Sequence, residues 1–229
     1  MFQRIDRAVI FFLVLNATSP ATAGLFTTAL SPDDALQLKH VAVVSVLGDT
    51  LHARQIGLTV FQNKSFDVSV PDWALDAGIR TYLQEKLIAS GRIKGDVDPL
   101  VVPTSDRKAI LALARDATFD AVIAVLPEQD PNDRLLPPGA GITRRKLLGL
   151  DHLQACDGMV VRIWRVADGK QIGYSHPNQC TARPIAGVWH DNWSDFTEEE
   201  KHTTLELVRS FVQQQIEMTL LDLKLQPQQ

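Results

Sequence analysis

Four residues in the last quarter of the chain combine groups that could carry out chemistry. Within the segment 188–196, Trp189, His190, Asp191 and Trp193 bring together aromatic rings, an imidazole and a carboxylate. Adjacent His and Asp side chains can act as general acid and base, and tryptophans can anchor a protein partner. The same rings can also pack beneath the chain where it enters a helix. We expect packing, and we keep an acid/base pair in an aromatic cleft as the alternative.

A β-hairpin is predicted near the chain's two cysteines. Alternating apolar residues at 159–166 and 171–174 flank a three-residue loop that ends in Gly169, a favoured hairpin connection with Gly in the left-handed position. The register set by this loop places three pairs opposite one another: Arg162 with Tyr174, Trp164 with Ile172, and Cys156 with Cys180.

The cysteine pair permits two interpretations. An even number of cysteines in an exported protein normally forms disulfides. Zinc is the alternative, because the spacing from His152 to Cys156 recurs from His176 to Cys180. Residues four apart on a strand lie about 13 Å from each other, too far for one zinc ion. We therefore expect a disulfide, no metal site and no cofactor.

Three consecutive basic residues, Arg144, Arg145 and Lys146, end a stretch rich in proline and glycine at 127–150. Loops of this length inside a domain are usually functional or disordered. We expect a loop here, and we assign its basic residues, with the two tryptophans, to contact with a partner.

Composition limits the class of protein. The chain has 229 residues, of which 45% are hydrophobic and 22% charged, which is typical of a folded domain with a buried core. The formal net charge of −4 gives no electrostatic basis for nucleic acid as the main partner.

Residues 1–23 are typical of a secretory signal. Arg4 and Arg7 precede an apolar run at 8–17, and Ala21 to Ala23 match a small-x-small cleavage site. A membrane-spanning helix needs about 20 apolar residues, and no run in the chain is that long. We expect an exported chain, periplasmic or secreted, with no transmembrane segment.

Apolar periodicity after residue 40 predicts alternating strands and helices. Runs that are apolar on both faces indicate covered strands, and apolar residues spaced by four indicate helices. The expected elements are strands at 41–47, 100–102 and 121–126, hairpins of 56–60 with 66–70 and of 159–166 with 171–174, and helices at 72–90, 106–118 and 197–223.

This order predicts an α/β (α+β) fold: a mixed sheet with two helices on it, a C-terminal β-hairpin and a long C-terminal helix. We expect a lead-in segment at 24–40, a single domain at 41–225 and a disordered tail at 226–229. Asp72 is the expected N-cap of the first helix, and a capping box from Thr197 to Glu200 is expected to open the last.

The arrangement resembles a group of bacterial envelope α/β domains. The group includes the TolB amino-terminal domain, the curli-secretion-channel family and lipoprotein activators of penicillin-binding proteins. The resemblance extends over about residues 41–225. It is carried by the opening strand at 40–45, the helix with Leu83 and Leu87, the strand at 119–125 and the hairpin at 161–170. The chain departs from the group by lacking a lipidation cysteine and by carrying the long loop.

The resemblance implies a non-enzymatic protein that contacts other envelope proteins. We therefore expect an exported, non-catalytic envelope protein that binds another envelope protein. The alternative is a secreted hydrolase that uses His190 and Asp191.

Overall fold

The computed structural model of the chain describes residues 27–129, 138–147, 150–177, 180–181 and 188–227. The expected signal at 1–23 and the proline-rich residues 130–137 lie outside these ranges.

Within the described residues, eight strands form one mixed sheet with α2, α3 and α4 packed on its faces and the short helix α1 at one end, which confirms the predicted fold class. The strand order is β3-β2-β6-β7-β5-β1-β4, and β8 pairs with β7. The strands are β1 (His40–Ser45), β2 (Thr50–Ile56), β3 (Lys64–Ser69), β4 (Asp96–Pro99), β5 (Ala121–Pro127), β6 (Gly139–Leu147), β7 (Leu150–Arg165) and β8 (Gln171–Ser175). The helices are α1 (Pro32–Gln37), α2 (Leu75–Ser90), α3 (Arg107–Asp116) and α4 (Glu198–Asp222).

The long strand β7 joins two halves of this sheet. Its residues 159–165 pair with β5 and its residues 150–158 pair with β6. β1 is parallel to β5, and β2 is parallel to β6. We call β4, β1, β5 and β8 the first half-sheet and β3, β2 and β6 the second half-sheet.

The step from β1 to β2 is held by Asp76, in the first turn of α2. Its carboxylate accepts hydrogen bonds from the Ser45 hydroxyl and from the backbone N–H groups of Leu47 and Gly48. In return, Asp49 accepts the N–H of Leu75 at 2.9 Å. Asp49 thereby satisfies a donor at the start of the helix that has no intrahelical partner.

The expected N-cap at Asp72 was therefore wrong. Residues Pro71–Trp73 form a 3-10 turn, and α2 begins at Leu75 after Ala74 in a left-handed conformation. The cap comes from a residue 26 positions earlier in the chain, which local sequence patterns do not reveal.

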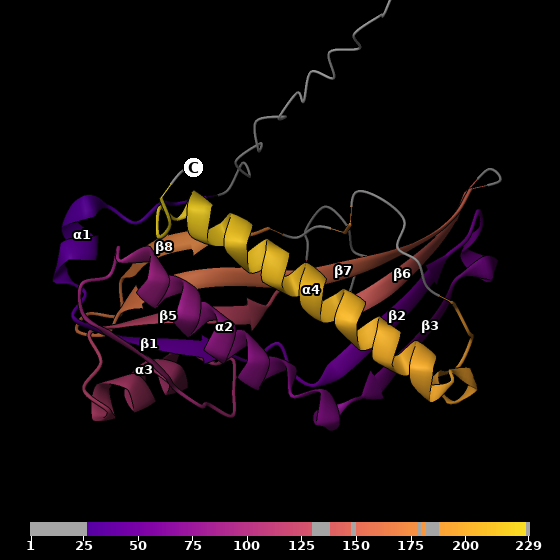
Figure 1. The fold of residues 1–229 in the computed structure, drawn as a ribbon, viewed down its shortest axis with the longest axis horizontal. Helices are drawn as coiled ribbons and strands as arrows, with labels where there is room; N and C mark the ends of the chain where they lie inside the picture. The colour runs from indigo at the N-terminus through magenta and orange to yellow at the C-terminus, as the bar shows by residue number, and fades with distance from the viewer. Residues whose placement is uncertain (1–26, 130–137, 148–149, 178–179, 182–187, 228–229) are drawn as a thin grey trace, which may run out of the picture.

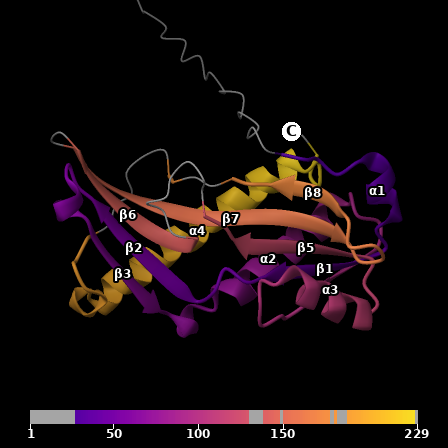
Figure 2. The same ribbon diagram turned by 180° about the vertical axis from the view of Figure 1, so that it is seen from behind.

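The two faces of the sheet have separate cores. On one face, Val41, Val43 and Ile123 pack with the buried residues of α2 and α4. On the other face, Ala42 and Val44 pack with α3. The stripe predicted on α2 is confirmed, since Leu75, Ile79, Leu83 and Leu87 are all buried. Figure 1 shows α4 crossing one face of both half-sheets diagonally, and Figure 2 shows α3 on the reverse.

The capping box at the start of α4 is confirmed. The Thr197 hydroxyl accepts the N–H of Glu200, and the Glu200 carboxylate accepts the N–H of Thr197. The helix then continues for 25 residues with one buried face that includes Val208, Val212 and Ile216.

Two strand predictions were wrong in position. The first hairpin pairs β2 (50–56) with β3 (64–69), so Leu58 and Val60 belong to the turn rather than to a strand. The short strand expected at 100–102 lies instead at 96–99, where β4 pairs with β1. Both predictions followed runs of apolar residues. In the folded protein these residues lie just outside the paired parts of the strands.

The loop expected at 127–150 was also wrong in part, because residues 139–147 form β6 between β2 and β7. Gly141 explains the error. A Cβ atom at this position would lie 2.1 Å from the carbonyl oxygen of His52 in β2. Glycine here permits close approach of two strands, although in the sequence it is typical of a loop.

The C-terminal hairpin has the predicted register over most of its length. Arg162 lies opposite Tyr174, with its guanidinium 5.2 Å from the ring centroid. Cys156 lies opposite Cys180, and the two form a disulfide, which rules out the zinc alternative at these thiols. The predicted pairing of Trp164 with Ile172 was wrong: Trp164 lies opposite Gln171, because the register shifts after Ile163.

Candidate functional site

The tryptophan segment packs between β3 and the start of α4. Trp193 contacts Trp73 and Phe196, with ring centroids 5.8 and 4.9 Å apart respectively. Trp189 lies 5.8 Å from Phe66 of β3. Both tryptophans are half-buried against the main core. These rings therefore hold the segment onto the sheet and leave part of their surface to solvent.

His190 and Asp191 bond to different partners. The His190 imidazole lies 3.3 Å from a Glu200 carboxylate oxygen and packs edge-on against Phe196. Asp191 accepts hydrogen bonds from the Lys64 ammonium and, at 3.3 Å, from the Trp189 indole. An acid/base pair requires hydrogen-bond reach between the groups that exchange the proton. The structure joins His190 to Glu200 and Asp191 to Lys64.

The electrostatics of these carboxylates favour their ionised forms. Lys64 and then Trp189 lower the pKa of Asp191. The backbone N–H of Thr197 is the main cause of the lowered pKa of Glu200, and His190 adds to it. A carboxylate with a lowered pKa is a weak general base at neutral pH. Both groups are therefore suited to fixing the segment in place.

The basic residues expected in a loop lie at the end of β6. Arg144 donates two hydrogen bonds to the Asp151 carboxylate of β7, at 2.7 and 2.5 Å, and this lowers the pKa of Asp151. Arg144 and Lys146 are two residues apart on a strand, so their side chains project from the same face of the sheet. The positive charge of Lys146 lowers the pKa of Asp151 and of Asp191.

Asp191 lies within electrostatic reach of basic side chains on both β3 and β6. Lys64 of β3 bonds to it directly, and Lys146 interacts with it electrostatically. The pKa of Arg144 is raised mainly by its hydrogen bonds to Asp151, and the charge of Asp191 adds to this effect. The tryptophan segment and the basic residues are about 45 positions apart in the chain, yet the fold brings them to the same end of the second half-sheet.

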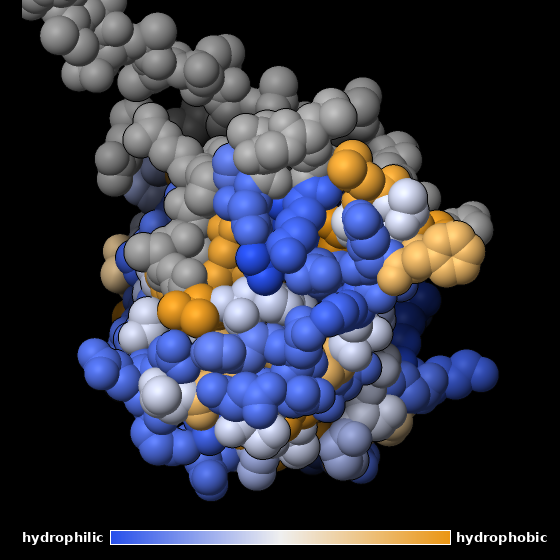
Figure 3. All heavy atoms as spheres, turned by 90° about the vertical axis from the view of Figure 1, so that its right-hand side faces the viewer, coloured by the Kyte–Doolittle hydropathy of each residue, from blue (hydrophilic) through white to orange (hydrophobic). Residues whose placement is uncertain are grey.

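Sequence reasoning missed a third component, which we call the apolar turn: residues 57–63 between β2 and β3. Phe61 is 95% exposed, Val60 75% and Leu58 59%. The turn directly follows Ile56, which pairs with Arg145 of β6, so it lies beside the basic residues. Figure 3 views this end and shows hydrophobic atoms interrupting a mostly hydrophilic surface. Because apolar residues alternate at 56–60, the sequence analysis assigned them to a half-buried strand and did not predict that their side chains would be exposed.

We call the combination of the apolar turn, residues 144–146 and residues 188–193 the distal surface. It combines three exposed apolar side chains with a network of opposite charges. Groups of His, Cys, Asp and Glu that could hold a metal do not occur in the described part of the chain. No described helix is long and apolar enough to cross a membrane.

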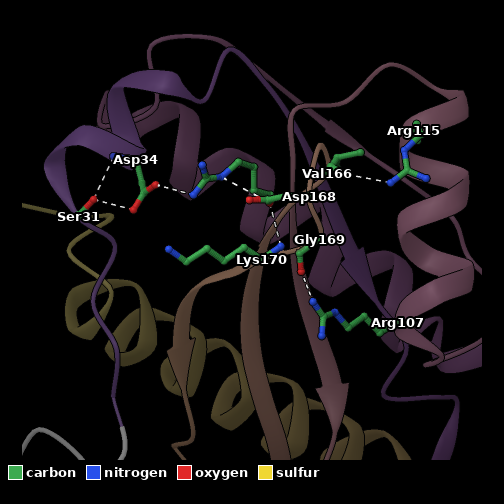
Figure 4. A network of polar contacts seen from close by, with 9 residues as sticks. Ser31, Asp34, Arg107, Arg115, Val166, Asp168, Gly169 and Lys170 are labelled. Carbon is green, nitrogen blue, oxygen red and sulfur yellow. Dashed lines mark hydrogen bonds and ion pairs between the residues drawn. The ribbon is translucent and has the colours of Figure 1, made fainter.

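A separate hollow of about 460 Å³ lies at the opposite end of the sheet, beside α1 and the β7–β8 turn. Its arginines are engaged by the fold. Arg165 pairs with Asp34 of α1 at 3.2 Å, and Arg115 donates to the carbonyl of Val166 at 3.1 Å. Figure 4 shows these contacts, together with the bond from Arg107 to Gly169, which tie α1 and α3 to the turn. We interpret this network as structural.

Fold and site define an α/β protein with a two-part sheet and a mixed apolar and charged surface at one end. No protein-family model matches the sequence, and no curated protein matches it. Among solved structures, the chain is similar to a PelC dodecamer from Paraburkholderia phytofirmans, with 14% identity and a TM-score of 0.39, over 89% of this chain and 97% of that one. A variant of the same PelC gives 11% identity and a TM-score of 0.35, over 88% and 96%.

Proposed function

We propose that this chain is an exported, non-catalytic protein of the bacterial envelope, periplasmic or secreted, that binds another envelope protein through the distal surface. The observation that carries the proposal is the ion pair of Lys64 with Asp191, which ties the tryptophan segment to β3 beside the apolar turn, where Phe61 is 95% exposed and β6 presents its basic residues.

The disulfide supports export. Disulfides such as Cys156–Cys180 form and persist in oxidising compartments and are rare in the reducing cytosol. The sequence pattern at 1–23 supports the same conclusion, since it is typical of a signal.

The composition of the distal surface supports protein binding. Protein interfaces combine a central apolar group with a polar rim, and aromatic residues and arginine are enriched in them. Phe61 provides an aromatic side chain that is almost fully exposed, and the charged network provides the rim. The contacts of His190 do not support the hydrolase alternative. Its imidazole lies against the Glu200 carboxylate, which caps α4, and not against Asp191.

The experiment is site-specific photocrosslinking in intact cells, with the photoreactive residue at position 61. Val101 is the matched control position, because its side chain is apolar and 72% exposed but lies outside the distal surface. We expect one discrete crosslinked partner from position 61 and none from position 101. We also expect Lys146→Glu to reduce the yield, because it reverses a rim charge. Equal capture from both positions, or no capture from position 61, would contradict the proposal.

A further inference from the structure

A groove lies at the other end of α4, remote from the distal surface. It has a volume of about 870 Å³ and lies where α1, the end of α2 and the end of α4 meet, at the left of Figure 1. This volume falls within the roughly 300–1,000 Å³ typical of sites for small molecules. Its apolar wall includes Leu36, which is 72% exposed, and Leu221, which is 37% exposed.

Three cations line the same groove: Arg92, Lys94 and Lys224. None of its lining residues is acidic, although the chain as a whole carries a net charge of −4. The side chains of these three cations form no hydrogen bond or ion pair with any residue in the described ranges. The groove therefore offers uncompensated positive charge beside an apolar wall.

Lys224 also has an unusual backbone conformation. It follows the last turn of α4 with φ of +59°, and its N–H bonds to the carbonyl of Leu221. Helices commonly end with glycine in this left-handed conformation, and α2 does so at Gly91 with φ of +61°. A lysine here carries conformational strain that glycine would avoid. Lysine near a helix C-terminus also complements the helix dipole, but a position one turn earlier would provide that benefit without the strain.

The occupant that fits is one with a negative head and an apolar body. We propose that this groove binds a small amphiphilic anion of the fatty-acid class, with its carboxylate among Arg92, Lys94 and Lys224 and its aliphatic chain along Leu36 and Leu221. Charge complementarity selects the head group, because the groove has three cations and no carboxylate. The exposed leucines select the chain, because covering them removes apolar surface from water.

Binding of monomeric dodecanoate to the mature, disulfide-bonded protein tests the proposal, measured by titration calorimetry and by amide chemical shifts. We expect saturable one-to-one binding with shifts at the groove. Dodecyltrimethylammonium has the same chain and the opposite charge, and we expect it not to bind. Butyrate has the same head and a short chain, and we expect it to bind at least about tenfold more weakly.

Lys224→Gly separates a binding role from a structural one. This change removes the ammonium and relieves the left-handed strain, so we expect the melting temperature to be unchanged or raised while dodecanoate affinity falls by about fivefold or more. The double variant Arg92→Gln/Lys94→Gln should also weaken binding. Lys108→Gln, an exposed lysine on α3, is the matched control and should leave affinity unchanged.

Three results would show that the groove is not a site for an amphiphilic anion. They are an absence of saturable dodecanoate binding, equal affinity for the cationic amphiphile, and full affinity in Lys224→Gly. Displacement of dodecanoate by an acidic peptide with higher affinity would overturn the fatty-acid class in favour of a protein segment. The distal surface lies at the opposite end of α4, so the groove variants should leave photocrosslinking from position 61 unchanged. Failure of this proposal is therefore distinguishable from failure of the proposed function.

Discussion

The carboxylate of Asp76, in the first turn of α2, accepts a hydrogen bond from the backbone N–H of Leu47 at 2.9 Å. This bond links a helix to the short connection between β1 and β2, where the first half-sheet gives way to the second. Together with β7, which pairs with both half-sheets, this connection positions the second half-sheet and with it the distal surface.

Asp76→Ala should therefore destabilise the fold. The change leaves the N–H groups of Leu47 and Gly48 and the hydroxyl of Ser45 without their acceptor. Hydrogen bonds to a charged group contribute about 1.5–3 kcal/mol each to stability. Because the three donors are only partly buried, water can replace part of what they lose, and we expect a total loss of at least about 3 kcal/mol in urea unfolding. Asp72→Ala, on the preceding turn, is the control and should change stability by less than about 0.5 kcal/mol. Equal effects of the two changes would refute the role of Asp76.

The buried carboxyl of Asp157 should make stability depend on pH. Asp157 lies opposite Ala140 in the β6–β7 ladder, is 1% exposed, and neither oxygen has a hydrogen-bond partner in the described structure. Burial raises its pKa well above the ordinary value of 3.8. The folded state therefore retains a proton that the unfolded state releases, so stability from this group is full below about pH 4 and falls as pH rises toward the folded pKa.

Asp157→Asn removes this titration. Relative to wild type, the variant should gain stability as pH rises above about 4, with a slope of at most about 1.4 kcal/mol per pH unit. Urea unfolding of both proteins across this range measures the difference. A difference that does not change with pH would show that Asp157 is ionised in the folded protein.

Reduction of the Cys156–Cys180 disulfide should lower stability. The bond closes a loop across 24 positions of sequence. Constraint of the unfolded chain by a loop of this size is expected to contribute about 3 kcal/mol. The melting temperature of the wild type should fall in reductant, whereas that of Cys156→Ala/Cys180→Ala should be low in both conditions. This expectation would be contradicted if complete reduction left the melting temperature of the wild type unchanged.

Two aromatic residues of the distal surface should respond differently to truncation. Trp193→Ala removes contacts with Trp73 and Phe196 and should cost about 2 kcal/mol, less than the 3–5 kcal/mol of a fully buried ring. Phe61→Ala removes a side chain that is 95% exposed and should leave stability within about 0.5 kcal/mol.

Partner capture provides the second measurement on the same pair. Phe61→Ala should reduce photocrosslinking from a neighbouring position while the melting temperature stays unchanged. If both variants lost the same stability, Phe61 would be packed and the apolar turn would not be available to a partner.

Local patterns in the sequence determined the helices and the central strands. The four-residue spacing of Leu75, Ile79 and Leu83 defined the buried face of α2, and the Thr197–Glu200 pattern defined the start of α4. The predicted hairpin register placed Cys156 opposite Cys180, and this pairing is confirmed although the register shifts by one residue beside the turn. Each of these signals operates over a few residues, so an isolated sequence contains it.

Tertiary structure alone decided the rest. Pairing with β2 and β7 places Gly141 in β6, where the close approach of β2 leaves no room for a side chain. Asp49 caps α2 from the other side of the β2–β3 hairpin. The meeting of Lys64, Lys146 and Asp191 joins three separate parts of the chain. These relationships depend on which strands pair and how β7 joins two half-sheets, and pairing between distant segments leaves no periodic signal in the sequence of either one.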